Sequence, residues 1–212
     1  MEQKLLRTQM NPHFIFNSLG AINTFIQEDK SDEASDYLIK FSRLTRLILN
    51  NSRKEYISLD EEINTLKYYM DLQNMLSDGT INYNINVDEK LDLKNAKVPP
   101  MLAQPFIENS LKHGFKNKEG LKEINVKFSK SKNSNALLFE VQDNGIGINK
   151  AKEAKTQTDE NHESFAMQIT EERLTNLNKY RSEKIKIHLE ELINTEGIIS
   201  GTLVNFTIPY LT

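Results

Sequence analysis

The chain has 212 residues, with 27 Lys and Arg against 30 Asp and Glu, and a formal net charge of −3. This weakly acidic balance excludes a general nucleic-acid binder and a polybasic membrane binder. The absence of cysteine excludes disulfide scaffolds, thiolate zinc sites and cysteine nucleophiles. No apolar run approaches the roughly 20 residues of a membrane-spanning helix, and no signal peptide opens the chain, so we expect this stretch to be soluble by itself.

The hydrophobic period changes near residue 80, from the three-and-four spacing of helices to strict alternation. We therefore predict two domains, a helical one over 1–78 and an α+β one over 79–212. One-sided alternation in the second domain indicates an antiparallel or mixed sheet, covered on one face by helices near 101–113 and 166–180. The alternating positions are Ile81, Tyr83, Ile85 and Val87; Ile124, Val126 and Phe128; Leu137, Phe139 and Val141; Ile185, Ile187 and Leu189; and Val204, Phe206 and Ile208.

Three helices are predicted in the first domain. Ser31 is placed to cap the second helix, and the third should begin near Leu59, because Ser58 and Glu61 have the spacing of a capping box. Stripes on so few helices cannot close a core alone, so we expect a homodimer that completes a four-helix bundle. The apolar stripes are Ile15, Leu19, Ile22 and Ile26; Leu38, Phe41, Thr45 and Ile48; and Ile63, Leu66, Tyr69 and Met70.

The first candidate site lies in the segment from Asn11 to Asn17. On a helix, His13 and Asn17 share the side opposite the first stripe, so His13 should face outward. Pro12 marks either a helix start or a kink. A lone histidine is usually a satisfied core residue, but an exposed neutral imidazole is a competent nucleophile, and Asn17 could orient its ring.

The second candidate site lies on the predicted helix that ends at Gly114, which we expect at the C′ position. Glu108, Asn109 and Lys112 share one helix face. A carboxylate, an amide oxygen and an ammonium group on one face can hold Mg²⁺ and neutralise phosphate oxygens. The alternative is a solvated face with an ion pair between Glu108 and Lys112. The opposite face carries Phe106, Ile107 and Leu111.

The third candidate site follows a predicted strand, from Asp143 to Gly147. Gly145 and Gly147 would let the backbone approach a flat ligand closely, and Asp143 could accept a hydrogen bond from an exocyclic amine. A turn that closes a hairpin would explain the glycines as well.

The order of these segments resembles the cytoplasmic core of the LytS/YesM-type sensor histidine kinases. The resemblance covers nearly the whole chain, and its first and third segments are the most specific. The segments are residues 9–19 for the phosphoacceptor box, 58–62 with 68–73 for the linking helix, 99–114 for the N box, 143–147 for the G1 box, and Gly201 with Thr202 for the closing glycine motif.

The resemblance implies a dimerising helical hairpin or bundle followed by a Bergerat-type (GHKL) α/β sandwich that binds ATP. It implies an ATP-dependent protein-histidine kinase that autophosphorylates His13 from Mg-ATP and passes the phosphoryl group to an aspartate of a response regulator. The remaining carried-over roles are Asn109 as the Mg²⁺ ligand, Lys112 on the phosphates, His113 lining the nucleotide pocket, Asp143 on the adenine amine, Gly145 and Gly147 admitting the base, Gly201 and Thr202 closing the nucleotide site, and Glu108 as a candidate general base.

The sequence departs from the family pattern at the second glycine box, which falls on residues 164–167. Ser164 and Ala166 stand where the family has glycines, although this box lets backbone N–H groups wrap the phosphates. The change is either a tolerated variant of the ATP lid or a mark of weak ATP binding. The alternative function is therefore a catalytically weak dimeric signalling scaffold with a degenerate lid.

Phe14 stands where the better-known histidine kinases have an acidic residue directly after the histidine. A base must then come from elsewhere, such as Glu108 or Asn17 acting through water. The resemblance also implies a sensor region upstream, usually with membrane spans. We therefore expect a cytoplasmic domain of a protein anchored in the inner membrane, with contact to the membrane only through that region.

Overall fold

The structure is a computed structural model that describes residues 12–77, 79–131, 136–149, 185 and 187–209. The chain divides into two compact units, which are Met1–Thr80 with Lys97–Met101, and Ile81–Ala96 with Leu102–Thr212. We call them the helical unit and the sheet unit. Among the described helices, none combines the length and the hydropathy of a membrane-spanning segment.

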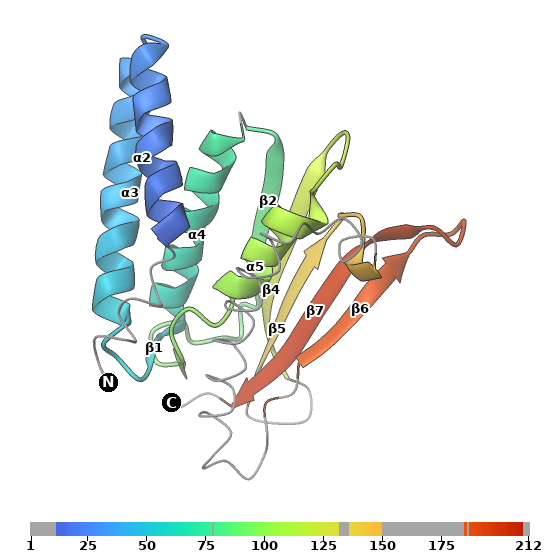
Figure 1. Ribbon diagram of the computed structural model, residues 1–212. Helices are drawn as coiled ribbons and strands as arrows, with labels where there is room; N and C mark the ends of the chain where they lie inside the picture. Colours follow the sequence, from blue (N-terminus) through green and yellow to red (C-terminus); the bar gives the residue numbers. More distant parts are fainter. Residues whose placement is uncertain (1–11, 78, 132–135, 150–184, 186, 210–212) are drawn as a thin grey trace. The chain divides into compact units, whose positions relative to one another are not determined.

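In its described residues the helical unit contains three helices and a short ladder, which Figure 1 labels. Helix α3 packs against α2 on one side and α4 on the other. The two-residue strands β1 and β3 pair antiparallel, with Ile57 opposite Val98. The element bounds are α2 (Pro12–Gln27), α3 (Ser31–Asn51), β1 (Ile57–Ser58), α4 (Leu59–Leu76) and β3 (Lys97–Val98).

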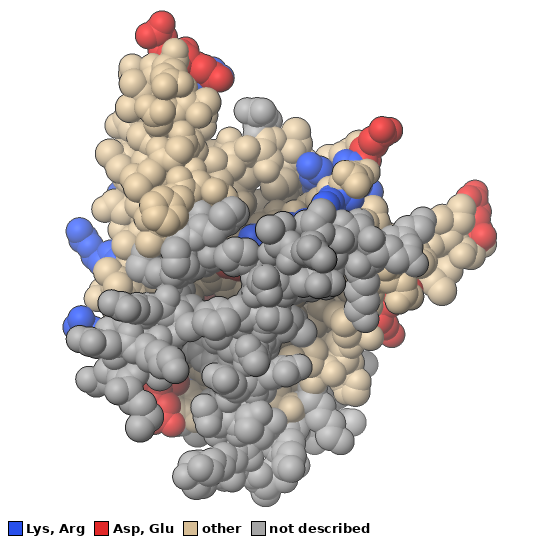
Figure 2. Space-filling model, viewed as in Figure 1, with Lys and Arg blue, Asp and Glu red and all other residues tan. Residues whose placement is uncertain are grey.

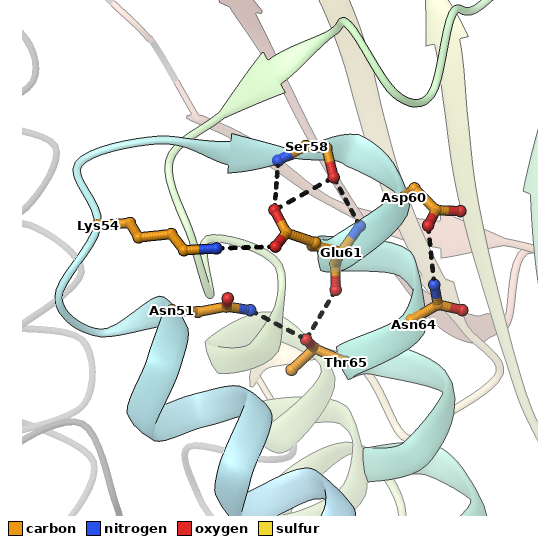
Figure 3. A network of polar contacts seen from close by, with 7 residues as sticks. All are labelled: Asn51, Lys54, Ser58, Asp60, Glu61, Asn64 and Thr65. Atoms are coloured by element: carbon orange, nitrogen blue, oxygen red, sulfur yellow. Dashed lines mark hydrogen bonds and ion pairs between the residues drawn. The ribbon is translucent and has the colours of Figure 1, made fainter.

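The predicted start of the third helix is confirmed. Helix α4 begins at Leu59, and the Ser58 side chain accepts a hydrogen bond from the backbone N–H of Glu61 at 3.2 Å. The Glu61 carboxylate in turn accepts from the backbone N–H of Ser58 at 2.9 Å, and it pairs with Lys54 at 2.8 Å (Figure 3). The hydrogen bond from Lys54 is the main reason that the pKa of Glu61 lies below its ordinary value. All four predicted stripe residues of α4 are buried.

The predicted stripe of α2 is only in part its packed side. Leu19 and Ile26 are 52% and 59% exposed, so these two positions of the predicted stripe do not pack within their own chain. The ring of Phe14 lies on the packed side instead, where an aromatic side chain buries a large apolar area. Phe14 lies 6.0 Å from Phe41 and 5.6 Å from Tyr69 between ring centroids.

The predicted stripe of α3 is also shifted. Leu38 is 50% exposed, whereas Ile48 is buried and Phe41 is half-buried. Ser31 does not cap this helix but is its first residue, and the N-cap residue Lys30 makes no side-chain capping bond. The helix contacts neighbours on two sides, which selects a different set of buried positions. The buried residues are Ala34, Tyr37, Leu44, Ile48 and Asn51.

Helix α2 has an uncharged outer side. Its sequence contains no Lys, Arg, Asp or Glu, and Phe16 is 71% exposed beside Leu19 and Ile26. Figure 2 shows acidic side chains at the tip of the α2–α3 hairpin and mostly uncharged side chains below them on the face in view. Acidic Asp32 and Glu33 stand in the first turn of α3, where the helix dipole favours negative charge.

The sheet unit contains one five-stranded mixed sheet, as predicted. The strand order is β2-β4-β5-β7-β6, with β2 parallel to β4 and the other pairs antiparallel. Helix α5 and the π-helical turn η1 follow β3 in the chain. The bounds are β2 (Ile81–Val87), α5 (Gln104–Asn109), η1 (Ser110–Gly114), β4 (Lys122–Lys130), β5 (Ala136–Asp143), β6 (Ile187–Ile193) and β7 (Ile199–Pro209).

Four aromatic rings join α5 to the sheet. Phe106 of α5 lies 5.4 Å from Phe206 of β7, which lies 4.7 Å from Phe139 of β5, and Phe139 lies 5.2 Å from Phe128 of β4. The predicted alternation is confirmed for β2, β4, β5 and β7. In the edge strand β6 it is wrong for Leu189, which is 52% exposed. The predicted helix near 166–180 lies outside the described residues.

Candidate functional site

The segment predicted as a single helix over 101–113 contains two kinds of helix. Helix α5 ends at Asn109, and a π-helical turn follows from Ser110 to Gly114. Gly114 is therefore the last residue of the turn and lacks a positive φ, so its prediction as a C′ residue is wrong. The wider turn changes which residues face inward, since Ser110 and Gly114 are buried whereas Leu111 is half-buried. Such π-turns occur frequently at functional sites.

Asp143 lies at the centre of a buried polar cluster beside this turn. The Ser110 hydroxyl donates to its Oδ2 at 2.6 Å, and the backbone N–H of Gly145 donates to its Oδ1 at 2.8 Å. Asp143 is only 5% exposed, and burial raises the pKa of its carboxyl, although bonds from Ser110, Gly145 and the Thr202 backbone act in the opposite direction. Each carboxylate oxygen has a second lone pair, so the group retains capacity to accept from a ligand amine.

Two glycines in this cluster are required by close approach of the backbone. A Cβ at Gly145 would collide with the carbonyl oxygen of Gly114, and one at Gly201 would collide with the carbonyl oxygen of Asp143. The backbone N–H of Ile146 donates to the Gly114 carbonyl at 2.9 Å, which ties the two segments together. The structure thus gives Gly145 a packing role in addition to the ligand approach that the sequence predicts.

Asn144 fastens the loop to the neighbouring strand. Its Oδ1 accepts from the backbone N–H of Glu123 at 2.9 Å, and its Nδ2 donates to the carbonyl of Leu121 at 3.0 Å. The strand β5 that precedes this loop has β4 and β7 as its neighbours, and neither follows the loop directly. The alternative of a simple hairpin turn is therefore wrong.

Glu191 of β6 holds the far end of the same loop. Its carboxylate accepts from the backbone N–H of Asn149 at 2.9 Å and from the Asn149 side chain at 3.1 Å. Gly147 has a φ of +85°, and a Cβ there would meet the side chains of Ile199 and Glu191. Sequence reasoning missed Glu191, Asn144 and Ser110, because no periodicity or motif spacing joins residues so far apart in the chain.

The charged groups of α5 and η1 form a local network. The Glu108 carboxylate accepts from the side chain of Gln104 at 2.9 Å and lies 3.8 Å from the Lys112 ammonium group. The predicted i,i+4 ion pair is thus present. Lys112 is exposed, while Asn109 and His113 are half-buried and in contact with other groups.

The first candidate site belongs to the helical unit. His13 lies in the first turn of α2, and Asn17 lies one turn later with an exposed side chain. The described part of α2 begins at Pro12, so the choice between a helix start and a kink stays open. Ser164 and Ala166 lie outside the described residues.

A preformed cage for a metal ion is absent from the described residues, where no three His, Asp or Glu side chains gather. Mg²⁺ commonly takes one or two protein ligands together with substrate phosphates. The amide oxygen of Asn109, near Glu108 and Lys112 in the chain, is chemically suited to be such a protein ligand.

Comparisons with known proteins agree with this architecture. Residues 1–81 match the family described as histidine kinase. The chain is 36% identical over 151 residues to the sensor histidine kinase/phosphatase LytS of Staphylococcus aureus strains MRSA252 and NCTC 8325. The match covers 71% of this chain and 25% of each relative, so it spans about a quarter of the length of those proteins.

Solved structures show the same fold. The histidine kinase domain of the blue-light activated kinase EL346 from Erythrobacter litoralis aligns with a TM-score of 0.50 at 17% identity, covering 98% of this chain and 92% of that one. A bacterial phosphotransferase aligns with a TM-score of 0.53 at 12% identity, covering 97% and 95%. The predicted fold, helices followed by a layered α+β unit, is confirmed.

Residues 1–81 of the chain therefore carry the sequence features of the histidine kinase family. Within that family it is most informatively compared with the sensor histidine kinases of the LytS type, as its sequence predicts. The relatives named above are histidine kinases, in agreement with the predicted enzyme class.

Proposed function

We propose that the chain is the core of a two-component sensor kinase that transfers the γ-phosphoryl group of ATP to His13. An imidazole nitrogen of His13 forms the new P–N bond while ADP leaves. The phosphoryl group then passes to an aspartate of a response regulator, which regenerates the histidine. The observation that carries this proposal is the buried Asp143 carboxylate, held by Ser110 and Gly145, in a chain whose residues 1–81 match the histidine kinase family.

In this proposal the sheet unit binds the nucleotide. Asp143 accepts from the adenine amine with the capacity that Ser110, Gly145 and the Thr202 backbone leave open, and its fixed position orients the base. Gly147, Gly201 and Thr202 line the same loop and strand end. His113 borders the base, and Ser164 and Ala166 belong to the lid over the phosphates.

The polar face formed by the end of α5 and by η1 binds the phosphates in this proposal. Asn109 provides the amide oxygen for Mg²⁺, which supplies charge neutralisation when it is bound. Lys112 is close enough to Glu108 for a weak ion pair and is exposed, so its ammonium group can exchange that partner for a phosphate oxygen. Glu108 acts as a general base, with Asn17 as a second candidate through water.

The helical unit is proposed to form a homodimer. The outer side of α2 is uncharged and exposes Phe16, Leu19 and Ile26, which a second copy would cover in a four-helix bundle. The whole protein is proposed to join this core to a membrane-anchored sensor region, as the LytS resemblance implies. Its partner is a response regulator.

The test is incubation with Mg²⁺ and γ-labelled ATP, scoring protein-bound label that survives base and is lost in acid. The unchanged chain should be labelled, His13→Ala should not, and His188→Ala should match the unchanged chain, because His188 is exposed on β6. Absence of label from the unchanged chain, together with no rise in melting temperature on adding Mg-ATP, would overturn the kinase and support the scaffold alternative.

A further inference from the structure

A buried carboxylate on α4 binds the backbone of a distant segment. Glu62 is only 2% exposed, and its Oε2 accepts a hydrogen bond from the backbone N–H of Met101 at 2.8 Å. A low-dielectric surrounding makes a hydrogen bond electrostatically stronger than it is in water. None of the proposed steps of nucleotide binding or phosphoryl transfer uses Glu62.

Met101 has an unusual backbone conformation. Its φ is +57°, and the other non-glycine residues with positive φ in the described ranges are Asp29 and Asn117. Asp and Asn tolerate this left-handed region, whereas a long side chain such as Met rarely adopts it. Such a conformation persists where the surrounding contacts determine it, and it occurs often at functional hinges and clamps.

The residues before Met101 are fixed to the helical unit. Val98 is 2% exposed and pairs with Ile57 of β1, and Pro99 and Pro100 are buried with the restricted φ of proline. Met101 itself is 7% exposed. The segment Lys97–Met101 thus belongs to the helical unit although both of its flanks belong to the sheet unit.

Met101 is also the last residue of this segment that belongs to the helical unit. The next residue, Leu102, belongs to the sheet unit, and α5 begins at Gln104. The chain between the Glu62 contact and the first turn of α5 is therefore too short to contain a flexible linker. Only Leu102 and Ala103 separate Met101 from the first residue of α5.

We propose that Glu62 is a positioning residue for phosphoryl transfer, which fixes through Met101 the point where the chain leaves the helical unit for the nucleotide-binding helix. This role rests on the proposed function. It deepens that function because His13 and the nucleotide residues lie in different units, and transfer between them requires a defined geometry. Nucleotide binding itself uses residues of the sheet unit and should depend little on Glu62.

The test compares three variants of the full chain. Glu62→Met keeps the approximate length of the side chain but removes the acceptor, and Glu62→Gln keeps an acceptor oxygen. Asp60→Asn is the matched control, because Asp60 lies on the same helix and contacts Asn64 (Figure 3). The readouts are the dissociation constant for Mg-ATP, the initial rate of His13 labelling, and amide hydrogen exchange of the segment containing Met101.

We expect Glu62→Met to be labelled at least about tenfold more slowly, because misplaced reactants lose that much rate or more, while its affinity for Mg-ATP stays within about threefold. The Met101 amide should exchange faster in this variant. Glu62→Gln and Asp60→Asn should keep rates within about threefold of the unchanged chain, since the acceptor for Met101 is retained.

Equal labelling of Glu62→Met and the unchanged chain would overturn the proposal, as would an equal loss in Glu62→Gln. If Glu62→Met does not fold, Glu62→Asp provides the second variant, because it keeps the carboxyl group but shortens the side chain by one carbon, which draws the acceptor away from the Met101 N–H. Labelling of Glu62→Asp at the unchanged rate would also overturn the role. Absence of label from the unchanged chain, together with no rise in its melting temperature on adding Mg-ATP, would overturn the proposed function, and this result is distinct because it appears without any substitution.

Discussion

The Ser110 hydroxyl donates a hydrogen bond of 2.6 Å to the buried carboxylate of Asp143, across 33 positions of the chain. The bond joins the π-helical turn after α5 to the end of β5. It therefore places the proposed adenine acceptor and the proposed phosphate-binding face on one rigid support. Motion of either segment alone would break a charge-assisted hydrogen bond in a buried setting.

Nucleotide affinity should depend on this pair. Asp143→Asn retains the size of the side chain but loses the negative acceptor, so we expect the dissociation constant for ATP to rise at least about tenfold. Ser110→Ala should weaken binding less, because it removes the support and keeps the acceptor. Calorimetric titration with ATP measures both, with Asp88→Asn on the surface as the control. An unchanged affinity in Asp143→Asn would contradict the adenine role.

Asp143 should also leave a signature in the pH dependence of stability. Burial raises the pKa of its carboxyl above the ordinary value of 3.8, so the folded chain binds the proton more tightly than the unfolded chain. Its contribution is therefore most favourable at low pH and is lost as the pH rises through the raised pKa. As the pH is lowered from about 7 to about 4, the melting temperature of the unchanged chain should therefore rise relative to that of Asp143→Asn.

A buried hydroxyl pair should couple α2 to α3. Tyr37 donates to the Ser18 hydroxyl at 3.1 Å, and both residues are fully buried. Either Tyr37→Phe or Ser18→Ala leaves one buried polar group without its partner, which costs about 1 to 3 kcal/mol. The double variant should cost less than the sum. Urea unfolding measures the cycle, and strict additivity would show that the two hydroxyls do not interact.

The capping box should contribute measurably to the stability of α4. Ser58→Ala removes the acceptor for the Glu61 backbone N–H, and we expect a loss of about 1 kcal/mol in the free energy of unfolding. Ser42→Ala, at an exposed position inside α3, should change stability little. Glu61 adds a pH dependence to this stability. Since the pKa of its carboxyl is lowered below 4.5, the contribution of Glu61 to the free energy of unfolding is present above that pH and is lost as the pH falls through the lowered pKa.

The outer side of α2 should determine the oligomeric state. Leu19→Glu combined with Ile26→Lys places charges at positions that are more than half exposed in the single chain, so each chain should still fold. The proposed dimer would have to bury these charges, and sedimentation should show a monomer. Leu121→Lys, at a position 57% exposed in the sheet unit, is the control and should leave the state unchanged. An unchanged dimer in the double variant would contradict this interface.

Local signals account for the parts of the fold that the sequence predicts. The start of α4 follows from Ser58 and Glu61, which are three residues apart, and the strands follow from alternation within single segments. The inner side of α2 could not be predicted in the same way, because Leu19 and Phe14 are both apolar and only the packing decides between them. The π-turn could not be predicted for a similar reason, because Ser110 turns inward toward a partner far along the chain.

In the candidate site, too, some residues could be predicted from local sequence and others only from the structure. Motif resemblance identified Asp143, and the structure adds the groups that hold its loop in place. Glu191 contacts Asn149 across 42 positions, and the contact between Glu62 and Met101 spans 39. Neither spacing follows a helical or strand period, so a single sequence contains no signal for them. The chemical roles of His13 and the nucleotide residues remain predictions.

The attachment of Lys97–Met101 to the helical unit has a practical consequence when the two units are expressed separately. A fragment that starts at residue 79 retains Val98 and Met101 but lacks β1 and α4, which otherwise cover them. Apolar side chains stripped of their cover promote self-association. Expression of the nucleotide-binding half alone therefore calls for polar replacements at Val98 and Met101, or for a graft of residues 57–62 onto its amino terminus.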